Sequence, residues 1–372
     1  MSVTGNMGAQ ARWITTEIVD EGEVAMPGEK IPPRAGASFG VGSLPHRDLD
    51  EAVDFAWRAT SIPTIPSLPR RSPAEAMVAQ ALVGIPGVSA GQYAGISVDV
   101  AALDPDAPVE TDLDADAFGA FSAFLSSVAA RGAGATPLVK WQFIGPVTLG
   151  VALGRAGLAP DVAHRLALNA VRARISSLHA HVAAAFPVAT QIVVLDEPSL
   201  ATALEPGSAL GGDDVVDLVS GALAAVPAPH MAGLHCCARL DWGAMLATGA
   251  TLLSVPVPTS SDPEAMSEML LAAARISDHL DQGGRIAWGA VRTDGPVPAT
   301  PERPWKQLME SMCQLVRAGV DPHMLRRCSV ATPACGLAAH SEPLAERVMS
   351  HVRAVGDRVA QQATASRLTL GS

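Results

Sequence analysis

The sequence predicts a parallel α/β protein, specifically a (β/α)8 TIM barrel, and three observations lead to this prediction. Short apolar runs alternate with helix-period runs along the 372 residues, as in a parallel sheet covered by helices. The number of apolar runs is close to the eight strands of a barrel. A doubly wound open sheet is the alternative, but no G-x-G-x-x-G follows the first apolar run and there is no P-loop, so the usual marker of nucleotide-binding folds is missing.

The elements follow in order along the chain. Residues 1–36 lack periodicity and contain mixed charges, so we expect an irregular N-terminal arm before a single barrel domain at 37–365. Nine apolar runs are predicted strands, one of them an additional hairpin or edge strand: 37–43, 64–68, 94–100, 137–145, 191–196, 231–236, 251–257, 285–291 and 328–334.

Several of the intervening helices carry start signals. Asp48 lies three residues before Glu51, and Ser72 precedes Pro73 and Glu75, in patterns typical of capped helix N-termini. Further starts are predicted at Asp161 and at Asp262, with a closing helix near Ser341–Val355.

Composition excludes several classes of protein. Hydrophobic residues make up 48% and charged residues 17% of the chain, which rules out a disordered chain, a coiled coil and a collagen-like repeat. The net charge of −11, with lysine only at Lys30, Lys140 and Lys306, argues against a nucleic-acid partner. No run is long and apolar enough for a membrane span, and the N-terminus does not resemble a signal peptide, so we expect a cytoplasmic protein.

The five cysteines all lie in the last two fifths of the chain. An odd, clustered set is typical of metal binding or catalysis rather than of a disulfide framework. Cys313, in an amphipathic run, is expected to be a small buried hydrophobe. Cys236 is expected in the core, and Cys328 is expected to be structural at the far end of the barrel.

In a barrel, the residues after the carboxyl ends of the strands build the active site. Polar and soft ligands gather at these positions, although they are scattered over about 300 residues of sequence. They are Gly42, Ser43, His46, Gly145–Thr148, Asp196, Glu197, His235, Cys237 and Cys335.

His235 and Cys237, together with the distant Cys335, suit zinc. Imidazole and thiolate are preferred zinc ligands, and three protein ligands leave one position open for a substrate. Residues i and i+2 at a strand end point to the same side, so both side chains could reach one ion. The alternative is a buried histidine that happens to lie beside buried cysteines.

Asp196 and Glu197 end a very apolar run, and two roles are open to them. They could cap the following loop, or they could bind a substrate ammonium or act as a base; their place at the predicted active face favours the second role. Arg70, Arg71 and Arg292 could receive carboxylates or be surface charges. His46 is either a site residue or a loop histidine.

Six segments together resemble a known family: GSLPH, WQFIGPVTL, VVLDEPSL, LHCC…DW, AWGAV and ATPACGL. In this order, from about Gly40 to Arg353, they resemble the catalytic barrel of cobalamin-independent methionine synthase. The resemblance is greatest to the short, single-domain members of the superfamily that also includes uroporphyrinogen decarboxylase.

The resemblance implies an S-methyltransferase in which Zn²⁺ activates a thiol, most simply homocysteine, to accept a methyl group and give methionine. His235, Cys237 and Cys335 match the zinc ligands. Ser43, beside Gly42, matches the residue that holds the amino-acid carboxylate, and Asp196 matches the one that holds the ammonium. Asp196, His235 and Cys237 would thus be catalytic, and Glu197 would border the substrate. The implied second partner is a methyl-folate or a methyl-corrinoid protein.

The sequence departs from the family's pattern in three ways. We expect no counterpart of the N-terminal barrel of the full-length enzymes. The strand where a glutamate zinc ligand is expected contains no acid, so the fourth ligand is unassigned. The family's Asp-x-His-Ser-Pro segment is replaced by residues 288–293, which favours a corrinoid over a folate donor.

Three other functions remain open. A related alkyltransferase would use another thiol, such as coenzyme M, and would need mainly cationic groups for its sulfonate. A metal-free decarboxylase of the uroporphyrinogen type would need clustered arginines, for which only Arg70 and Arg71 are suggestive. A non-catalytic barrel would keep zinc for structure, and such a site is normally closed by four protein ligands.

Overall fold

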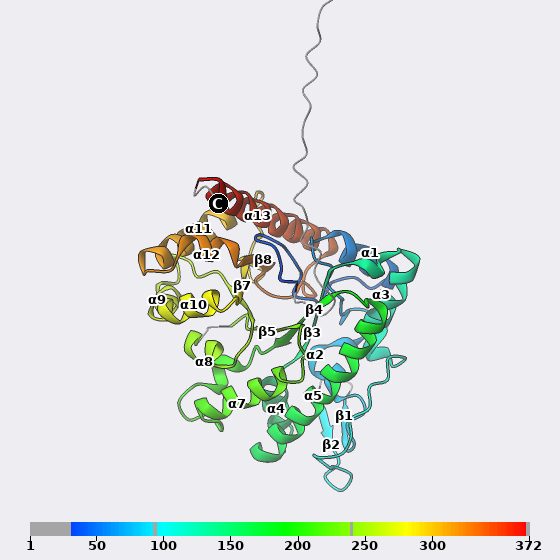
Figure 1. The fold of residues 1–372 in the computed structure, drawn as a ribbon. Helices are drawn as coiled ribbons and strands as arrows, with labels where there is room; N and C mark the ends of the chain where they lie inside the picture. Colours follow the sequence, from blue (N-terminus) through cyan, green and yellow to red (C-terminus); the bar gives the residue numbers. More distant parts are fainter. Residues whose placement is uncertain (1–30, 92–94, 239–240, 370–372) are drawn as a thin grey trace, which may run out of the picture.

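The computed structural model describes residues 31–91, 95–238 and 241–369, so most of the predicted N-terminal arm lies outside the described residues. It is an α/β fold around a curled parallel sheet whose strands follow one another in the order β3-β4-β5-β6-β7-β8 (Figure 1). The strands are β3 (Leu138–Ile144), β4 (Thr190–Asp196), β5 (Met231–His235), β6 (Leu252–Pro256), β7 (Arg285–Val291) and β8 (Ser329–Pro333).

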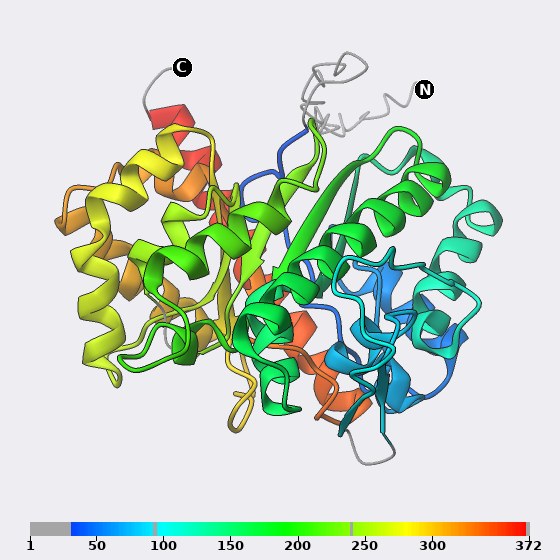
Figure 2. The ribbon, with the colours of Figure 1, turned by 90° about the horizontal axis from the view of Figure 1, so that it is seen from below.

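Helices surround this sheet on its outer side. In Figure 2 the yellow and orange helices lie on one side of the strands and the blue and cyan ones on the other. The helices are α1 (Leu49–Arg58), α2 (Met77–Leu82), α3 (Gly119–Ala130), α4 (Pro146–Arg155), α5 (Pro160–Ala185), α6 (Leu200–Ala203), α7 (Gly212–Leu223), α8 (Trp242–Ala247), α9 (Pro263–Leu271), α10 (Ala273–Asp281), α11 (Glu302–Arg317), α12 (Pro322–Arg327) and α13 (Glu342–Thr369).

Six predicted strands are confirmed, but the segments 37–43 and 64–68 are not strands, and a complete (β/α)8 barrel is not confirmed. The reason is local. Gly42 has a φ of +140°, outside the conformations of a strand, and Pro63 and Pro66 cannot donate a backbone hydrogen bond to a ladder.

These two segments nevertheless connect the edges of the sheet through isolated bridges. Ser38 pairs with Ala331 of β8, Ser43 pairs with Ser67, and Thr64 pairs with Lys140 of β3, each in parallel. Backbone N–H groups reinforce the link: Ala331 donates to the Ala37 carbonyl at 2.8 Å and Ile65 to the Lys140 carbonyl at 2.8 Å. Each segment thus follows a sheet edge without forming a regular strand.

The predicted strand 94–100 contributes only β2 (Ile96–Val98), which pairs antiparallel with β1 (Val88–Ala90). This two-stranded ribbon is separate from the main sheet. It confirms the expected additional hairpin.

The inner face of the curled sheet changes from apolar to polar along the strands. One cluster of buried side chains includes residues from every strand of the sheet, from the first irregular segment and from just before the second: Phe39, Ile62, Leu138, Ile192, Val194, Met231, Leu252, Ala287 and Val330. Because side chains alternate along a strand, Asp196 and His235 share this face at the carboxyl ends. The apolar part fills the interior, and polar groups lie at one end of it.

The predicted helix starts are largely confirmed. The Asp48 carboxylate accepts from the Glu51 N–H at 3.0 Å, and that of Asp262 accepts from the Ala265 N–H at 3.1 Å. The Ser72 hydroxyl accepts from the Ala74 N–H at 3.2 Å, although it begins a short 3₁₀ turn rather than an α-helix. The long helix α5 begins at Pro160, one residue before the predicted Asp161.

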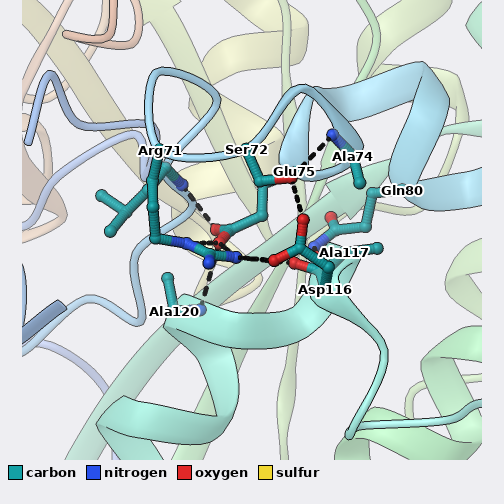
Figure 3. A network of polar contacts seen from close by, with 9 residues as sticks. Arg71, Ser72, Ala74, Glu75, Gln80, Asp116, Ala117 and Ala120 are labelled. Carbon is teal, nitrogen blue, oxygen red and sulfur yellow. Dashed lines mark hydrogen bonds and ion pairs between the residues drawn. The ribbon is translucent and has the colours of Figure 1, made fainter. Parts of the chain in front are cut away.

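A buried carboxylate anchors the chain just after the second irregular segment (Figure 3). Glu75 is 1% exposed and accepts from the Leu68 N–H at 2.7 Å, the Ala120 N–H at 3.3 Å and the Arg71 Nε at 2.7 Å. Arg71 also pairs with the exposed Asp116 at 2.7 Å. The network therefore joins the end of the segment 64–68 to the start of α3.

Among the described helices, none has the length and apolar character needed to cross a membrane.

The Glu75 network generates a stability prediction. Replacing Glu75 by Ala should lower the free energy of unfolding by about 3 kcal/mol, because it leaves the Arg71 guanidinium and two buried N–H groups without their acceptor. Replacing Asp116 by Ala should cost less than about 1 kcal/mol, because that partner of Arg71 is exposed. Urea denaturation of both variants measures the difference, and equal losses would contradict this account.

Candidate metal centre

The strand register places three polar residues at one level of the sheet. Asp196 of β4 pairs with His235 of β5, and His235 pairs with Ser254 of β6. Paired residues of neighbouring parallel strands point to the same face, so the three side chains lie side by side at the carboxyl ends.

His235, Cys237 and Cys335 come together as the sequence predicts. Their ligand atoms all lie within 4.8 Å of one another, and among the described residues no further His, Cys, Asp or Glu joins the group. The His235 ring is buried, and the two thiols are half-buried. Cys335 follows β8 and thus reaches the group from the other half of the sheet. The hydrogen bond between the two thiols lowers the pKa of Cys335 and raises that of Cys237, so a thiolate is favoured at Cys335.

Ser254 fixes the orientation of the His235 ring. Its Nδ1 lies 2.9 Å from the Ser254 Oγ and 3.2 Å from the Ser254 carbonyl oxygen, which can only accept. Nδ1 therefore holds the proton, and the lone pair of Nε2 is available. That atom is buried and has no hydrogen-bond partner in the described part of the chain. A ring held at one nitrogen and open at the other fits a zinc ligand.

The remaining cysteines differ in environment. Cys236 is fully buried, which confirms the expectation, and burial raises its pKa to about 11. Cys328 is also buried, at the N-terminal end of β8, where its sulfur accepts from the Arg285 guanidinium at 3.2 Å. The expectation for Cys313 is wrong: its thiol is exposed. It directly follows two buried residues of α11, Ser311 and Met312, and so lies past the edge of the apolar stripe.

Glu197 is completely buried, and its carboxylate binds the N-terminus of helix α4. Its carboxylate accepts from the Val147 N–H at 2.8 Å, the Thr148 N–H at 2.7 Å and the Thr148 hydroxyl at 2.5 Å. A Cβ on Gly145 would lie 2.1 Å from the carboxylate, so the approach requires glycine there. Burial raises the pKa of Glu197 to about 7. With its oxygens occupied, Glu197 caps the N-terminus of α4, which lies earlier in the chain, rather than the loop that follows it.

Asp196 is in the opposite situation. Its Oδ1 is buried and has no hydrogen-bond partner among the residues that the structure describes. Burial raises the pKa of the carboxyl group, while the neighbouring His235 and then Lys140 lower it. A buried acceptor without a partner is costly unless a ligand satisfies it, so Asp196 is suited to bind a donor such as an ammonium.

Gly42 and Ser43 lie beside the Cys335 loop. The Ser43 carbonyl accepts from the Leu337 N–H at 2.8 Å, and a Cβ on Gly336 would lie 2.1 Å from the Ser43 hydroxyl. Gly336 directly follows Cys335 in the sequence. The predicted carboxylate-binding residues and one candidate metal ligand therefore belong to adjoining loops.

A cavity of about 440 Å³ opens on the two thiols. Cys237 and Cys335 line it together with both apolar and polar residues. The apolar part includes Trp242, Pro256, Val257, Ala265 and Ala334, and the polar part includes Thr259, Asp262, Arg292, Thr293 and Asp294. The volume is within the range of small-molecule sites.

The arginines that the sequence singled out are all engaged. Arg71 belongs to the Glu75 network, Arg70 donates to the Ala339 carbonyl at 2.9 Å, and Arg292 donates to Asp294 at 2.9 Å. They do not form the cluster that a polycarboxylate substrate would need. His46 is buried, with its ring 4.9 Å from that of Phe55, and burial lowers its pKa.

Sequence reasoning missed one residue of the site region and the role of another. Ser254 orients His235, and Thr148 binds Glu197. A serine in the middle of the buried run LLSVP was the available signal for the first. The GPVT segment is among the candidate site residues, but only the fold shows that its threonine binds an acid 49 residues away.

Comparison with known proteins gives a limited result. No protein-family profile and no curated protein matches the chain. Among solved structures, the chain resembles a Listeria monocytogenes protein provisionally named a vitamin-B12 independent methionine synthase. The identity is 13%, the TM-score is 0.49, and the match covers 90% of this chain and 98% of the other.

The two adjacent acids provide a test of the site's organisation. Replacing Glu197 by Ala should lower the free energy of unfolding by about 3 kcal/mol, because it removes three hydrogen bonds at the start of α4. Replacing Asp196 by Ala should cost less than about 1 kcal/mol, because its buried Oδ1 has no partner to lose. Urea denaturation monitored by circular dichroism compares the variants. A larger loss for Asp196→Ala would show that this carboxylate is structural.

Proposed function

We propose that the protein is a zinc-dependent methyltransferase that methylates a thiol, most simply homocysteine to give methionine. The observation that carries the proposal is the group His235, Cys237 and Cys335, with a buried, unpartnered Nε2 on a histidine that Ser254 orients. The corresponding fold is a (β/α)8-type barrel in which the segments 37–43 and 64–68 occupy the positions of two strands.

His235, Cys237 and Cys335 would hold the zinc. A bound zinc ion lowers the pKa of a thiol ligand and so supplies a nucleophilic thiolate near neutral pH. Asp196 would bind the ammonium group of the acceptor, and Ser43 with the adjacent Gly42 would bind its carboxylate. In the net reaction a sulfur–carbon bond forms, the bond between the methyl group and its donor breaks, and the thiol loses its proton.

The cavity beside Cys237 and Cys335 supports a catalytic rather than a structural metal. Structural zinc sites are closed by four protein ligands, whereas catalytic sites have three and an open position. The described residues offer three candidate ligands. The family's fourth ligand would belong to β6, and the polar residue there, Ser254, instead binds His235. The cavity offers room for a methyl donor beside the open position.

The metal content of cysteine variants tests the ligand assignment. The purified protein should contain about one zinc ion per chain, and Cys237→Ser and Cys335→Ser should each lose most of it, because serine is a poor zinc ligand. Cys236→Ser and Cys313→Ser serve as matched controls, since neither thiol belongs to the group. Mass spectrometry of the metal content provides the measurement, and equal zinc in all variants would refute the assignment.

Methyl transfer itself is tested with the zinc-loaded protein and homocysteine, using methylcobalamin and 5-methyltetrahydrofolate as alternative donors. Methionine, detected by mass spectrometry, should form with one donor, and Cys335→Ser should abolish it while Cys313→Ser leaves it unchanged. No methionine from either donor would contradict homocysteine methylation. Methylation of coenzyme M in a parallel reaction would identify the related alkyltransferase.

A further inference from the structure

A buried lysine lies on the inner side of the curled sheet. It pairs with Ile192 of β4, and so lies nearer to the amino ends of the strands than Asp196. Lys140 of β3 is 1% exposed, and no described carboxylate lies within ion-pair distance of its ammonium. Burial lowers its pKa to about 7, and the charge of Asp196 opposes this effect. Burying an ammonium group without an ion-pair partner costs folding free energy, and this cost indicates a functional role for the lysine.

The ammonium group is held by two acceptors. Lys140 Nζ donates to the Val41 carbonyl and, at 2.8 Å, to the Gln142 Oε1. Gln142 in turn donates to the Ile65 carbonyl at 3.3 Å. Its amide packs so closely on Gly42 that a Cβ there would lie 2.0 Å from it. Lys140 thus fixes the backbone immediately before the Gly42–Ser43 pair.

The orientation of the Val41 carbonyl determines that of the next N–H. In a planar trans peptide the carbonyl of one residue and the N–H of the following residue point in opposite directions. Because the Val41 carbonyl points to Lys140, the Gly42 N–H points away from it. The Gly42 and Ser43 N–H groups donate to no residue in the described part of the chain. Two adjacent free donors of this kind suit an anion.

A purely structural role does not explain why this buried residue carries a charge. The segment 64–68 and the residue before it are already joined to β3 by backbone hydrogen bonds. The Lys140 N–H donates to the Pro63 carbonyl at 3.0 Å, and the Ile65 N–H donates to the Lys140 carbonyl at 2.8 Å. The segment 37–43 is likewise bound to β8. Phe39 and Ile62 add apolar anchors inside the sheet. These contacts do not need an ammonium group.

We propose that Lys140 is a positioning residue for substrates that carry a carboxylate. It holds the Val41 peptide so that the N–H groups of Gly42 and Ser43 can bind the anion. The inference rests on the proposed function and deepens it: the acceptor thiol is an amino acid or another carboxylate-bearing thiol, and Lys140 selects for the anionic group.

Equilibrium binding to the zinc-loaded, full-length protein tests the proposal. Isothermal titration calorimetry compares homocysteine with 3-aminopropane-1-thiol, which has the same chain and amine but no carboxylate. Lys140→Met should weaken homocysteine binding about tenfold or more, as expected for the loss of a charge-assisted hydrogen bond, and should change the affinity for the aminothiol by less than about twofold. Lys140→Gln can still donate to Val41 without a charge and should have an intermediate effect if Lys140→Met does not fold.

Arg285→Met provides the matched control. Arg285 is another buried basic residue, at the opposite end of the sheet, where it donates to the Gly283 and Gly284 carbonyls at 3.1 Å. This variant should leave the affinity for both thiols unchanged. If the lysine variants bind homocysteine as tightly as the original protein, or lose both thiols equally, the role of Lys140 is overturned while the proposed function stands. If the original protein binds neither thiol, both proposals fail.

Discussion

The parallel register of β4, β5 and β6 sets the level at which Asp196, His235 and Ser254 lie, and the candidate metal centre depends on it. Side chains alternate along a strand, so a slip of one residue in β5 would turn His235 toward the helices and bring Cys236 inside. Because Cys237 is two residues beyond His235, the same register points both candidate ligands to one place. Cys335 then completes the group from beyond β8.

The polar groups near the carboxyl ends of the strands fall into two kinds. Glu197 has its oxygens occupied by the start of α4, and Glu75 is likewise engaged by Arg71 and two N–H groups. The His235 Nε2 and the Asp196 Oδ1 are buried without a partner among the described residues. Buried polar atoms are normally hydrogen-bonded, and these two belong to paired residues at the carboxyl ends of neighbouring strands, so one ligand site there would satisfy both.

The order of the six regular strands could be predicted from apolar runs, because each is bounded by polar or glycine-rich turns. The same runs failed at 37–43 and 64–68, where glycine and proline reduce the ladder to single bridges that apolar content does not reveal. The i, i+2 spacing correctly predicted that His235 and Cys237 share a side. No local signal could show that Arg71 is engaged by Asp116, which lies 45 residues away, or that Glu197 caps a helix. Such contacts depend on the packing of elements that are distant in the sequence.

Zinc-edge X-ray absorption with and without homocysteine tests most directly whether the group of His235, Cys237 and Cys335 is an open, thiol-binding metal centre. The account predicts a zinc ion with two sulfur ligands that gains a third, at about 2.3 Å, when homocysteine is added. A coordination shell that does not change on addition of the thiol would contradict it and would indicate a closed, structural zinc site. Absence of zinc from protein never exposed to chelators would contradict it more strongly, since it would leave the three ligands without their metal.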